Sequence, residues 1–408
     1  MYDVLVIGAG PSGSVAAAFL HKAGLKVRVL EKETMPKFVI GESLLSNCNN
    51  ILEEAGLLDA VYNYGFQYKN GAAFSWGEKY TYIDFCDKSS VGSGTTFQVP
   101  RADFDKLLID EVQKLGVEVT YKCEVKAVDF SGQNAVLSVE NNGISENLEA
   151  KFVLDASGYG RILPTLLNLE TPSHLPPRSA YFTHIEDNIT EPLYDRNKIL
   201  ITTHPVHRDV WIWLIPFSNG RCSIGVVGEK HIINPSNLEI NPENNAEILK
   251  KCVYECPMLK RLLNNALWDT PVRNLNGYSK NVSRLYGDKY ALLGNATEFL
   301  DPVFSSGVTI ALYSAKIAAK CVIDEIKNGK ADWENDYAKE LMSGVDTFRV
   351  YVDGWYDGKF QDVIYYPKKD HKIKRYISSV LAGYAWDKSN PFVKDAKRHL
   401  DTLAELCK

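Results

Sequence analysis

A single lysine, Lys69, stands among aromatic and small residues in the stretch GFQYKNGAAFSWG, residues 65–77. An amine in such surroundings has two possible uses. If its stem runs along apolar neighbours to water, it is an ordinary surface lysine. If it is buried among Phe66, Phe74 and Trp76, desolvation lowers its pKa and suits it to bind or attack a reactive molecule. The sequence around Lys69 leaves both interpretations open.

The elements that would position such chemistry begin with a predicted βαβ unit at the N-terminus. A run of β-branched and leucine residues at 4–7 predicts a buried strand, an alanine-rich helix follows, and a second strand is expected at 26–30. Between the first strand and the helix, three glycines have the spacing G-x-G-x-x-G: Gly8, Gly10 and Gly13. They allow a tight turn, the approach of backbone N–H groups to a pyrophosphate, and close packing of helix on strand.

The second strand ends at Glu31, where an acid would accept hydrogen bonds from a ribose hydroxyl pair. A carboxylate there disfavours a 2′-phosphate, so NADP is not expected at this site. The N-terminal unit by itself leaves FAD and NAD open.

The composition is that of a globular protein, with 408 residues, 45% hydrophobic and 24% charged. A net charge of −5 argues against general nucleic-acid binding, which needs a basic field. Eight cysteines form no C-x-x-C pair, so we expect no metal site and a reduced, cytoplasmic setting. The N-terminus does not resemble a secretion signal, and no apolar run reaches the ~20 residues of a membrane span.

Three further segments resemble a large FAD-dependent family that includes aromatic hydroxylases, geranylgeranyl reductases and flavin-dependent halogenases. They are QVPRADFDKLL (98–108), FVLDASGYGR (152–161) and YALLGNATEFLDPVFSSGVTIAL (290–312). The resemblance implies FAD as the cofactor. It also implies FAD contacts from Gly8, Gly10, Pro11, Ser12, Gly13, Glu31, Lys32, Glu42, Ser43, Arg101, Asp155, Gly158, Asn295, Asp301, Pro302, Gly307 and Val308.

Three stretches are similar to flavin-dependent halogenases in particular. FVIGESLL (38–45) resembles the segment that passes near the flavin ring, FLDPVFSSG (299–307) fits F-x-x-P-x-x-S-x-G, and DVWIWLIP (209–216) contains W-x-W-x-I-P. The resemblance assigns Ser305 to catalysis and places chloride or bromide near Ser306 and Gly307. It makes Trp211 and Trp213 a wall between flavin and substrate. The alternatives are a helix N-cap packed on the flavin and two core tryptophans.

The same resemblance makes Lys69 the catalytic lysine. Reduced FAD and oxygen would convert halide into hypohalous acid, which crosses to Lys69 and is directed at an electron-rich ring. Phe304 stands where tryptophan halogenases carry a glutamate, which favours a phenol or pyrrole substrate, free or tethered to a carrier protein. Val210 and Asn295 also depart from the family pattern, which has glycine and aspartate there.

The expected fold is α/β: a Rossmann-type, p-hydroxybenzoate-hydroxylase-like FAD-binding domain with an inserted antiparallel-sheet substrate domain and a helical C-terminal region. The FAD domain would comprise 1–75, 100–160 and 276–330, the substrate domain 76–99 and 161–275, and the helical region 331–408. The aromatic residues of 350–366 would line the substrate chamber, cover it, or fill the core.

Two other functions remain open. An FAD-dependent monooxygenase or a geranylgeranyl-reductase-like dehydrogenase or reductase shares the cofactor motifs and has no need of Lys69. A flavin-binding protein with a sensing or carrier role is the second. No dedicated NAD(P)H motif follows the FAD motifs, so a halogenase of this sequence would receive reduced flavin from a separate reductase.

Overall fold

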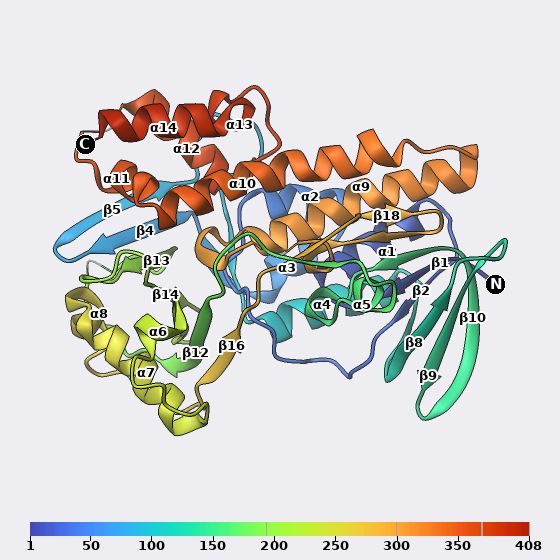
Figure 1. Cartoon of the computed structure of the whole chain (residues 1–408), viewed down its shortest axis with the longest axis horizontal. Helices are drawn as coiled ribbons and strands as arrows, with labels where there is room; N and C mark the ends of the chain where they lie inside the picture. Colours follow the sequence, from blue (N-terminus) through green and yellow to red (C-terminus); the bar gives the residue numbers. More distant parts are fainter. Residues whose placement is uncertain (193, 299, 369, 408) are drawn as a thin grey trace.

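Two sheets dominate the computed structural model, which describes residues 1–192, 194–298, 300–368 and 370–407 (Figure 1). The first sheet has eight strands, and β1 pairs in parallel with both β2 and β10. Its main path runs through β18 (Tyr286–Gly287), β19 (Tyr290–Leu292), β10 (Ile144–Asp155), β1 (Tyr2–Ile7), β2 (Val27–Leu30) and β7 (Glu118–Thr120). The hairpin of β8 (Cys123–Asp129) and β9 (Ala135–Asn141) extends β10.

Helices cover this sheet and explain why β1 is a continuous apolar run. α1 (Pro11–Lys22) packs against α4 (Arg101–Lys114) and α9 (Ser306–Asn328). Near them lie the shorter elements α2 (Asn47–Ala55), α3 (Leu58–Tyr64), η1 (Gly158–Gly160), α5 (Ile162–Leu166), η2 (Gly294–Ala296) and η3 (Pro302–Phe304). The predicted first strand, the glycine turn and the helix after it are therefore all found.

By length and composition, α9 is the one helix of the described chain that could cross a membrane, and 67% of its most apolar window is buried inside the protein. Core helices of globular proteins have the same properties. The burial of α9 against α1 therefore explains its apolar composition without a membrane.

The second sheet has seven strands and forms the opposite side of the molecule. In order, they are β16 (Arg273–Asn276), β12 (Ser179–Glu186), β15 (Arg221–Gly228), β14 (Trp211–Pro216), β13 (Lys198–Thr203), β4 (Gly71–Trp76) and β5 (Lys79–Asp84). β13 and β4 are parallel, so the sheet is mixed and not purely antiparallel as expected. β4 also starts at Gly71, inside the range 1–75 that we had assigned to the FAD-binding domain.

The two faces of the second sheet differ in what they pack against. Alternate residues, such as Leu200, Ile212 and Leu214, form one core with the helices on the outer face. Those helices are α6 (Lys230–Ile233), α7 (Pro242–Glu255) and α8 (Pro257–Leu262). The intervening residues, among them Trp211 and Trp213, belong to the large core shared with the first sheet. Period-two alternation thus points the tryptophans inward.

The C-terminal region is helical, as predicted, and extends along both sheets at the top of Figure 1. α10 contacts α9 and η3, while α11 and α12 contact β5. The elements are η4 (Trp333–Lys339), α10 (Glu340–Tyr356), α11 (Lys359–Tyr365), α12 (His371–Leu381), α13 (Pro391–Lys394) and α14 (Ala396–Leu406). Two small sheets, β3 (Gln67–Lys69) with β6 (Thr96–Gln98) and β11 (Glu170–Pro172) with β17 (Lys280–Val282), complete the fold.

Candidate functional site

A cavity of about 580 Å³ is lined by residues of both sheets and of the segments between them. Most of the predicted site residues meet there, although they come from distant parts of the chain. The lining includes Gly8, Gly10, Pro11, Ser12, Glu31, Lys32, Glu42, Ser43, Arg101, Gly158, Trp211, Trp213, Asn295, Pro302, Ser305, Gly307 and Val308.

The glycine turn forms one end of the cavity. A Cβ at Gly13 would lie 2.0 Å from the carbonyl oxygen of Gly8, and a Cβ at Gly8 would lie 2.6 Å from that of Ala156. A Cβ at Gly10 would meet nothing closer than 4.0 Å. Gly8 and Gly13 therefore serve the packing of strand, turn and helix, whereas Gly10 leaves the backbone open for a ligand.

Glu31 is 1% exposed and is held by the chain's own donors. Its Oε2 accepts from the N–H of Ala9 at 2.9 Å, and its Oε1 accepts from the N–H of Glu33 and from Nζ of Lys37. A carboxylate offers about four acceptor positions. A ribose hydroxyl can therefore reach Glu31 at the remaining one, or by displacing the half-buried Lys37.

Arg101 starts α4 and is locked in place at the cavity. Its guanidinium makes two hydrogen bonds to Asp105, at 2.7 and 2.9 Å, and one to the carbonyl oxygen of Ile40 at 3.0 Å. The pair with Asp105 is a bidentate ion pair between buried side chains, which fixes the fork of N–H groups. Arg101 thereby joins α4 to the segment 38–42, and it offers a fixed positive charge beside the cavity.

The structure corrects the position of several predicted site residues, because Gly13, Asp155, Asp301 and Ser306 do not belong to the cavity lining. Asp155 is fully buried, and its carboxylate accepts from the backbone N–H groups of Ser157 and Leu163. Burial raises the pKa of Asp155, and these hydrogen bonds oppose that effect. Asp155 holds the turn after β10, and only through that turn does it act on the cavity.

The two tryptophans of β14 lie side by side at the cavity, with ring centroids 5.7 Å apart. The indole N–H of Trp213 donates to the Ser223 hydroxyl at 3.0 Å. A Cβ at Gly225, the residue opposite on β15, would lie 2.3 Å from the Trp213 ring. Only glycine at 225 allows this ring position, so Trp213 is held in one orientation.

The start of α9 forms another part of the cavity wall. Ser305 has a left-handed backbone, with φ of +57°, and Ser305, Gly307 and Val308 line the cavity. The first turn of α9 presents backbone N–H groups that have no partner within the helix. Phe299, the first residue of the predicted F-x-x-P-x-x-S-x-G motif, lies outside the described residues.

Lys69 is completely buried, 0% exposed, and no acidic side chain in the described chain forms an ion pair with it. Its Nζ donates to the Ser43 hydroxyl at 2.7 Å and to the carbonyl oxygen of Leu44 at 2.6 Å. Burial lowers the pKa of Lys69 to about 7. A neutral amine has two hydrogens and a lone pair, so both observed hydrogen bonds can be made while the lone pair stays available.

Lys69 does not itself line the cavity, whereas its partner Ser43 does. The amine therefore lies one side chain behind the cavity wall. The ring of Phe85 covers it on another side, with its centroid 5.2 Å from Nζ. Lys69 is neither a surface lysine nor directly exposed in the cavity.

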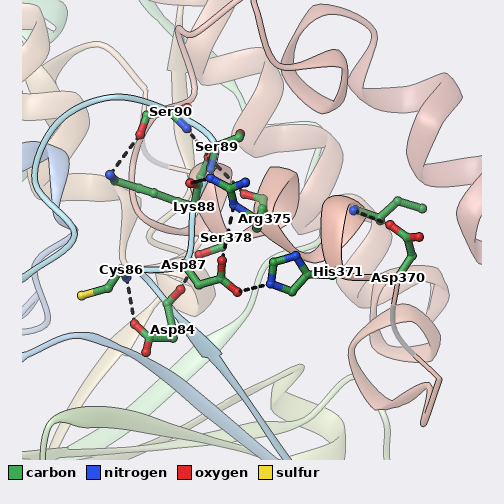
Figure 2. A network of polar contacts seen from close by, with 12 residues as sticks. Asp84, Cys86, Asp87, Lys88, Ser89, Ser90, Asp370, His371, Arg375 and Ser378 are labelled. Carbon is green, nitrogen blue, oxygen red and sulfur yellow. Dashed lines mark hydrogen bonds and ion pairs between the residues drawn. The ribbon is translucent and has the colours of Figure 1, made fainter.

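The loop after Phe85 is fastened to the C-terminal helices (Figure 2). The hydroxyl of Ser378 on α12 donates to the carbonyl oxygen of Asp84, and Arg375 donates to that of Lys88. Ser379 Oγ accepts from the backbone N–H groups of Ser89 and Ser90. α12 therefore holds the segment that closes over Lys69, a function for the C-terminal region that we had not predicted.

Several cavity residues escaped the sequence analysis. They are Ala180, Phe182, Ile199, Arg273 and Tyr278, whereas Phe38 and Tyr159 lie in the predicted segments 38–45 and 152–161 without an assigned role. Phe182 and Ile199 stand on strands with ordinary alternation, which marks one face as buried but does not distinguish cavity from core. The guanidinium of Arg273 lies 3.8 Å from the Phe38 ring centroid, a contact between residues 235 positions apart that no local pattern reveals.

The residues of this cavity fit FAD. The open backbone at Gly10, the acceptor at Glu31 and the fixed cation at Arg101 suit a dinucleotide with a pyrophosphate. Glu42 adds one acceptor: its Oε1 lies 2.6 Å from His184 Nε2, and its Oε2 is buried and finds no hydrogen-bond partner in the described residues. Such buried acceptors are usually satisfied, which favours a bound group at this end.

Comparisons with known proteins agree with this fit. The family model described as FAD binding domain matches residues 1–289. A pyrrole-2-carbonyl peptidyl-carrier-protein chlorinase from Pseudomonas fluorescens is 29% identical over 379 residues, which are 87% of this chain and 82% of that protein. The flavin-dependent halogenase gsfI from Penicillium aethiopicum is 30% identical over 373 residues, 86% of this chain and 70% of that protein.

Among solved structures, a flavoprotein/dehydrogenase from Cytophaga hutchinsonii has a TM-score of 0.94 and 43% sequence identity. The match covers 100% of this chain and 98% of that one. The overall architecture is therefore shared along the whole chain.

Proposed function

The chain belongs to the FAD binding domain family and is a homologue of flavin-dependent halogenases, and from this premise we propose that it halogenates an electron-rich aromatic substrate. It is an enzyme of the FAD-dependent oxidoreductase family. When bound, reduced FAD supplies, with oxygen, the two-electron oxidation that converts chloride or bromide into hypohalous acid. The protein's own residues separate the two halves of the reaction and direct the oxidant.

The observation that carries the proposal is the buried, unpaired amine of Lys69 behind the cavity wall. An ammonium that is buried without a counter-ion is costly, and the hydrogen bonds to Ser43 and Leu44 offset only part of that cost. With a pKa of about 7, part of the Lys69 population is neutral at neutral pH. Its two hydrogens stay bonded to Ser43 and Leu44, and its lone pair can then accept from a hypohalous acid that passes Ser43.

The tryptophans and the start of α9 support the same function. Trp211 and Trp213 line the cavity from the second sheet, and Gly225 and Ser223 fix Trp213. In our proposal these rings are the wall between flavin and substrate. The N–H groups at the start of α9 suit an anion, and the backbone at Ser305 and Gly307, both in the cavity lining, is our proposed halide site.

We infer the substrate class from Phe304, which is buried against Trp355 and Phe360. A carboxylate does not fit that apolar contact, which favours a phenol or pyrrole over tryptophan. The Pseudomonas fluorescens relative is named for a carrier-bound pyrrole, so a carrier-tethered ring is part of the proposal. A separate flavin reductase and a cytoplasmic location complete it.

The experiment uses the purified holoprotein. Its flavin is reduced without air, oxygen is admitted with bromide or chloride, and phenols and pyrroles are offered. Mass spectrometry then detects gain of halogen, gain of oxygen, or neither. Halogen gain supports the proposal; oxygen gain alone, or no change across both ring classes and both halides, refutes it.

Lys69→Met tests the role of the amine. We expect product to fall by about a thousandfold while FAD binding and oxygen consumption persist. Lys198→Met is the matched control, because Lys198 is also buried but pairs with Asp195 at 2.6 Å. That variant should keep its product within about threefold. Equal losses in both variants would contradict a chemical role for Lys69.

A dehydrogenase or reductase is the second candidate, because the Cytophaga hutchinsonii structure is described as a flavoprotein/dehydrogenase. Such an enzyme needs no halide and no amine. It would pass electrons between its flavin and an organic substrate under anaerobic conditions, and Lys69→Met would leave that rate nearly unchanged.

A further inference from the structure

Tyr356, the last residue of α10, joins two separate parts of the cavity wall. The indole N–H of Trp211, on β14, donates to the Tyr356 hydroxyl at 2.9 Å. The same hydroxyl donates to Asp301 Oδ2 at 2.8 Å. A phenol hydroxyl has one hydrogen to donate and lone pairs to accept with, so Tyr356 makes both bonds at once.

Asp301 links Tyr356 to the turn that precedes α9. Its Oδ1 accepts from the backbone N–H of Val303 at 3.1 Å and so caps the turn η3 that leads into Ser305. Its Oδ2 also accepts from Tyr278, a cavity residue, at 3.3 Å. One carboxylate therefore holds the turn and receives the hydroxyls of two tyrosines.

Arg178 lies beside Tyr356 and Asp301, and its positive charge balances the carboxylate of Asp301. Its guanidinium carbon lies 3.4 Å from the centre of the Tyr356 ring, and the side chain is 6% exposed. Burial raises the pKa of Asp301, and the charge of Arg178 and these hydrogen bonds oppose the rise. The cation over the ring keeps Tyr356 in place by a cation–π contact.

We propose that Tyr356 is a positioning residue that holds Trp211 and the turn before α9 in one fixed arrangement. The aromatic segment 350–366 would then be neither lid nor simple core, since its last helical residue on α10 sets the spacing between the tryptophan wall and the proposed halide site. This inference rests on the proposed function only for its catalytic consequence. The positional role stands on the contacts alone.

Tyr356→Phe removes the hydroxyl and keeps the ring beneath Arg178. The matched control is Tyr351→Phe on the same helix, whose hydroxyl donates to the carbonyl oxygen of Phe392 at 3.0 Å, away from the cavity lining. Both variants lose one buried hydroxyl from α10. Only Tyr356→Phe leaves Trp211 without its acceptor.

The first measurement needs no turnover. Indole N–H signals are recorded by ¹⁵N NMR of the holoprotein labelled at tryptophan, and Trp211→Phe assigns the signal of Trp211. We expect this signal to shift in Tyr356→Phe and its hydrogen exchange to speed up by roughly tenfold, the effect of losing one hydrogen bond. Tyr351→Phe should leave it unchanged. An unchanged signal in Tyr356→Phe, or the same change in both variants, overturns the proposal.

The second measurement concerns the catalytic consequence. A soluble scavenger traps hypohalous acid that escapes from the protein, and the trapped amount is compared with ring product. Tyr356→Phe should raise this ratio by about tenfold and raise the halide KM, with oxygen consumption unchanged. A shifted indole signal with an unchanged ratio and KM would overturn the coupling between wall and turn.

The two proposals fail separately. If the wild-type protein oxidises no halide, the proposed function is lost while the indole measurement still decides the role of Tyr356. If Tyr356→Phe does not fold, Asp301→Asn weakens the acceptor of the same hydroxyl, and the Trp211 signal is read in that variant with the same expected shift.

Discussion

Lys69 Nζ lies 2.7 Å from the hydroxyl of Ser43, so a fully buried amine is tied to a side chain of the cavity wall. This contact places Lys69 between two environments. On one side is the cavity that fits FAD, and on the other is the ring of Phe85.

The stability of the folded chain should depend on the titration of Lys69. Its folded pKa of about 7 lies below the ordinary value near 10.5, so between these values the unfolded chain binds a proton that the folded chain does not. Stability relative to Lys69→Met should therefore rise with pH from about 7 to about 10, by about 1.4 kcal/mol per pH unit at most. Below pH 7 this difference should be constant. Chemical denaturation of both proteins at several pH values measures it, and parallel curves would contradict the burial of an uncompensated amine.

Gly13→Ala should weaken FAD binding. The new Cβ would lie 2.0 Å from the carbonyl oxygen of Gly8, and because the clash is with backbone, α1 must move away from the turn. We expect a loss of about 1–3 kcal/mol in stability and at least about a tenfold loss in FAD affinity, measured by flavin fluorescence. Gly132→Ala is the control, because a Cβ there meets nothing closer than 3.6 Å. Unaltered FAD affinity in Gly13→Ala would exclude this turn as the pyrophosphate site.

Ser379→Ala should loosen the loop that covers Lys69. Its hydroxyl accepts from two backbone N–H groups, of Ser89 and Ser90, and the side chain is fully buried. Leaving these donors without a partner costs about 2 kcal/mol. Water should then reach Lys69 more often, so its rate of reductive methylation, followed by mass spectrometry, should rise several-fold. Ser343→Ala removes a half-buried hydroxyl that bonds only within α10 and should not change that rate. A rate that rises equally in both variants would show that the loop does not protect Lys69.

A structural feature can be predicted from the sequence when the interactions that form it lie between residues close together in the chain. The strand at 4–7, the glycine turn and the helix after it follow from apolar periodicity and from steric needs of residues within about ten positions, and they were predictable. The strand with Trp211 and Trp213 and the helix α9 follow from apolar periodicity of the same short range. The family resemblance, which is carried by such local motifs, is confirmed by the FAD binding domain match.

Tertiary structure decided the rest. β13 pairs with β4 in parallel, which the long connection between them allows, and the sequence of neither strand indicates its partner. The burial of Lys69 depends on Ser43, on Phe85 and on α12, more than 300 residues away. The hydrogen bonds of the Tyr356 hydroxyl with Trp211 and Asp301 bring together three positions that share no local sequence pattern. The sequence by itself determined a flavin-binding α/β protein, because the motifs for it depend on the spacing of neighbouring residues. Only the tertiary structure decided which side chains reach the cavity, because these contacts form between elements that are distant in the sequence.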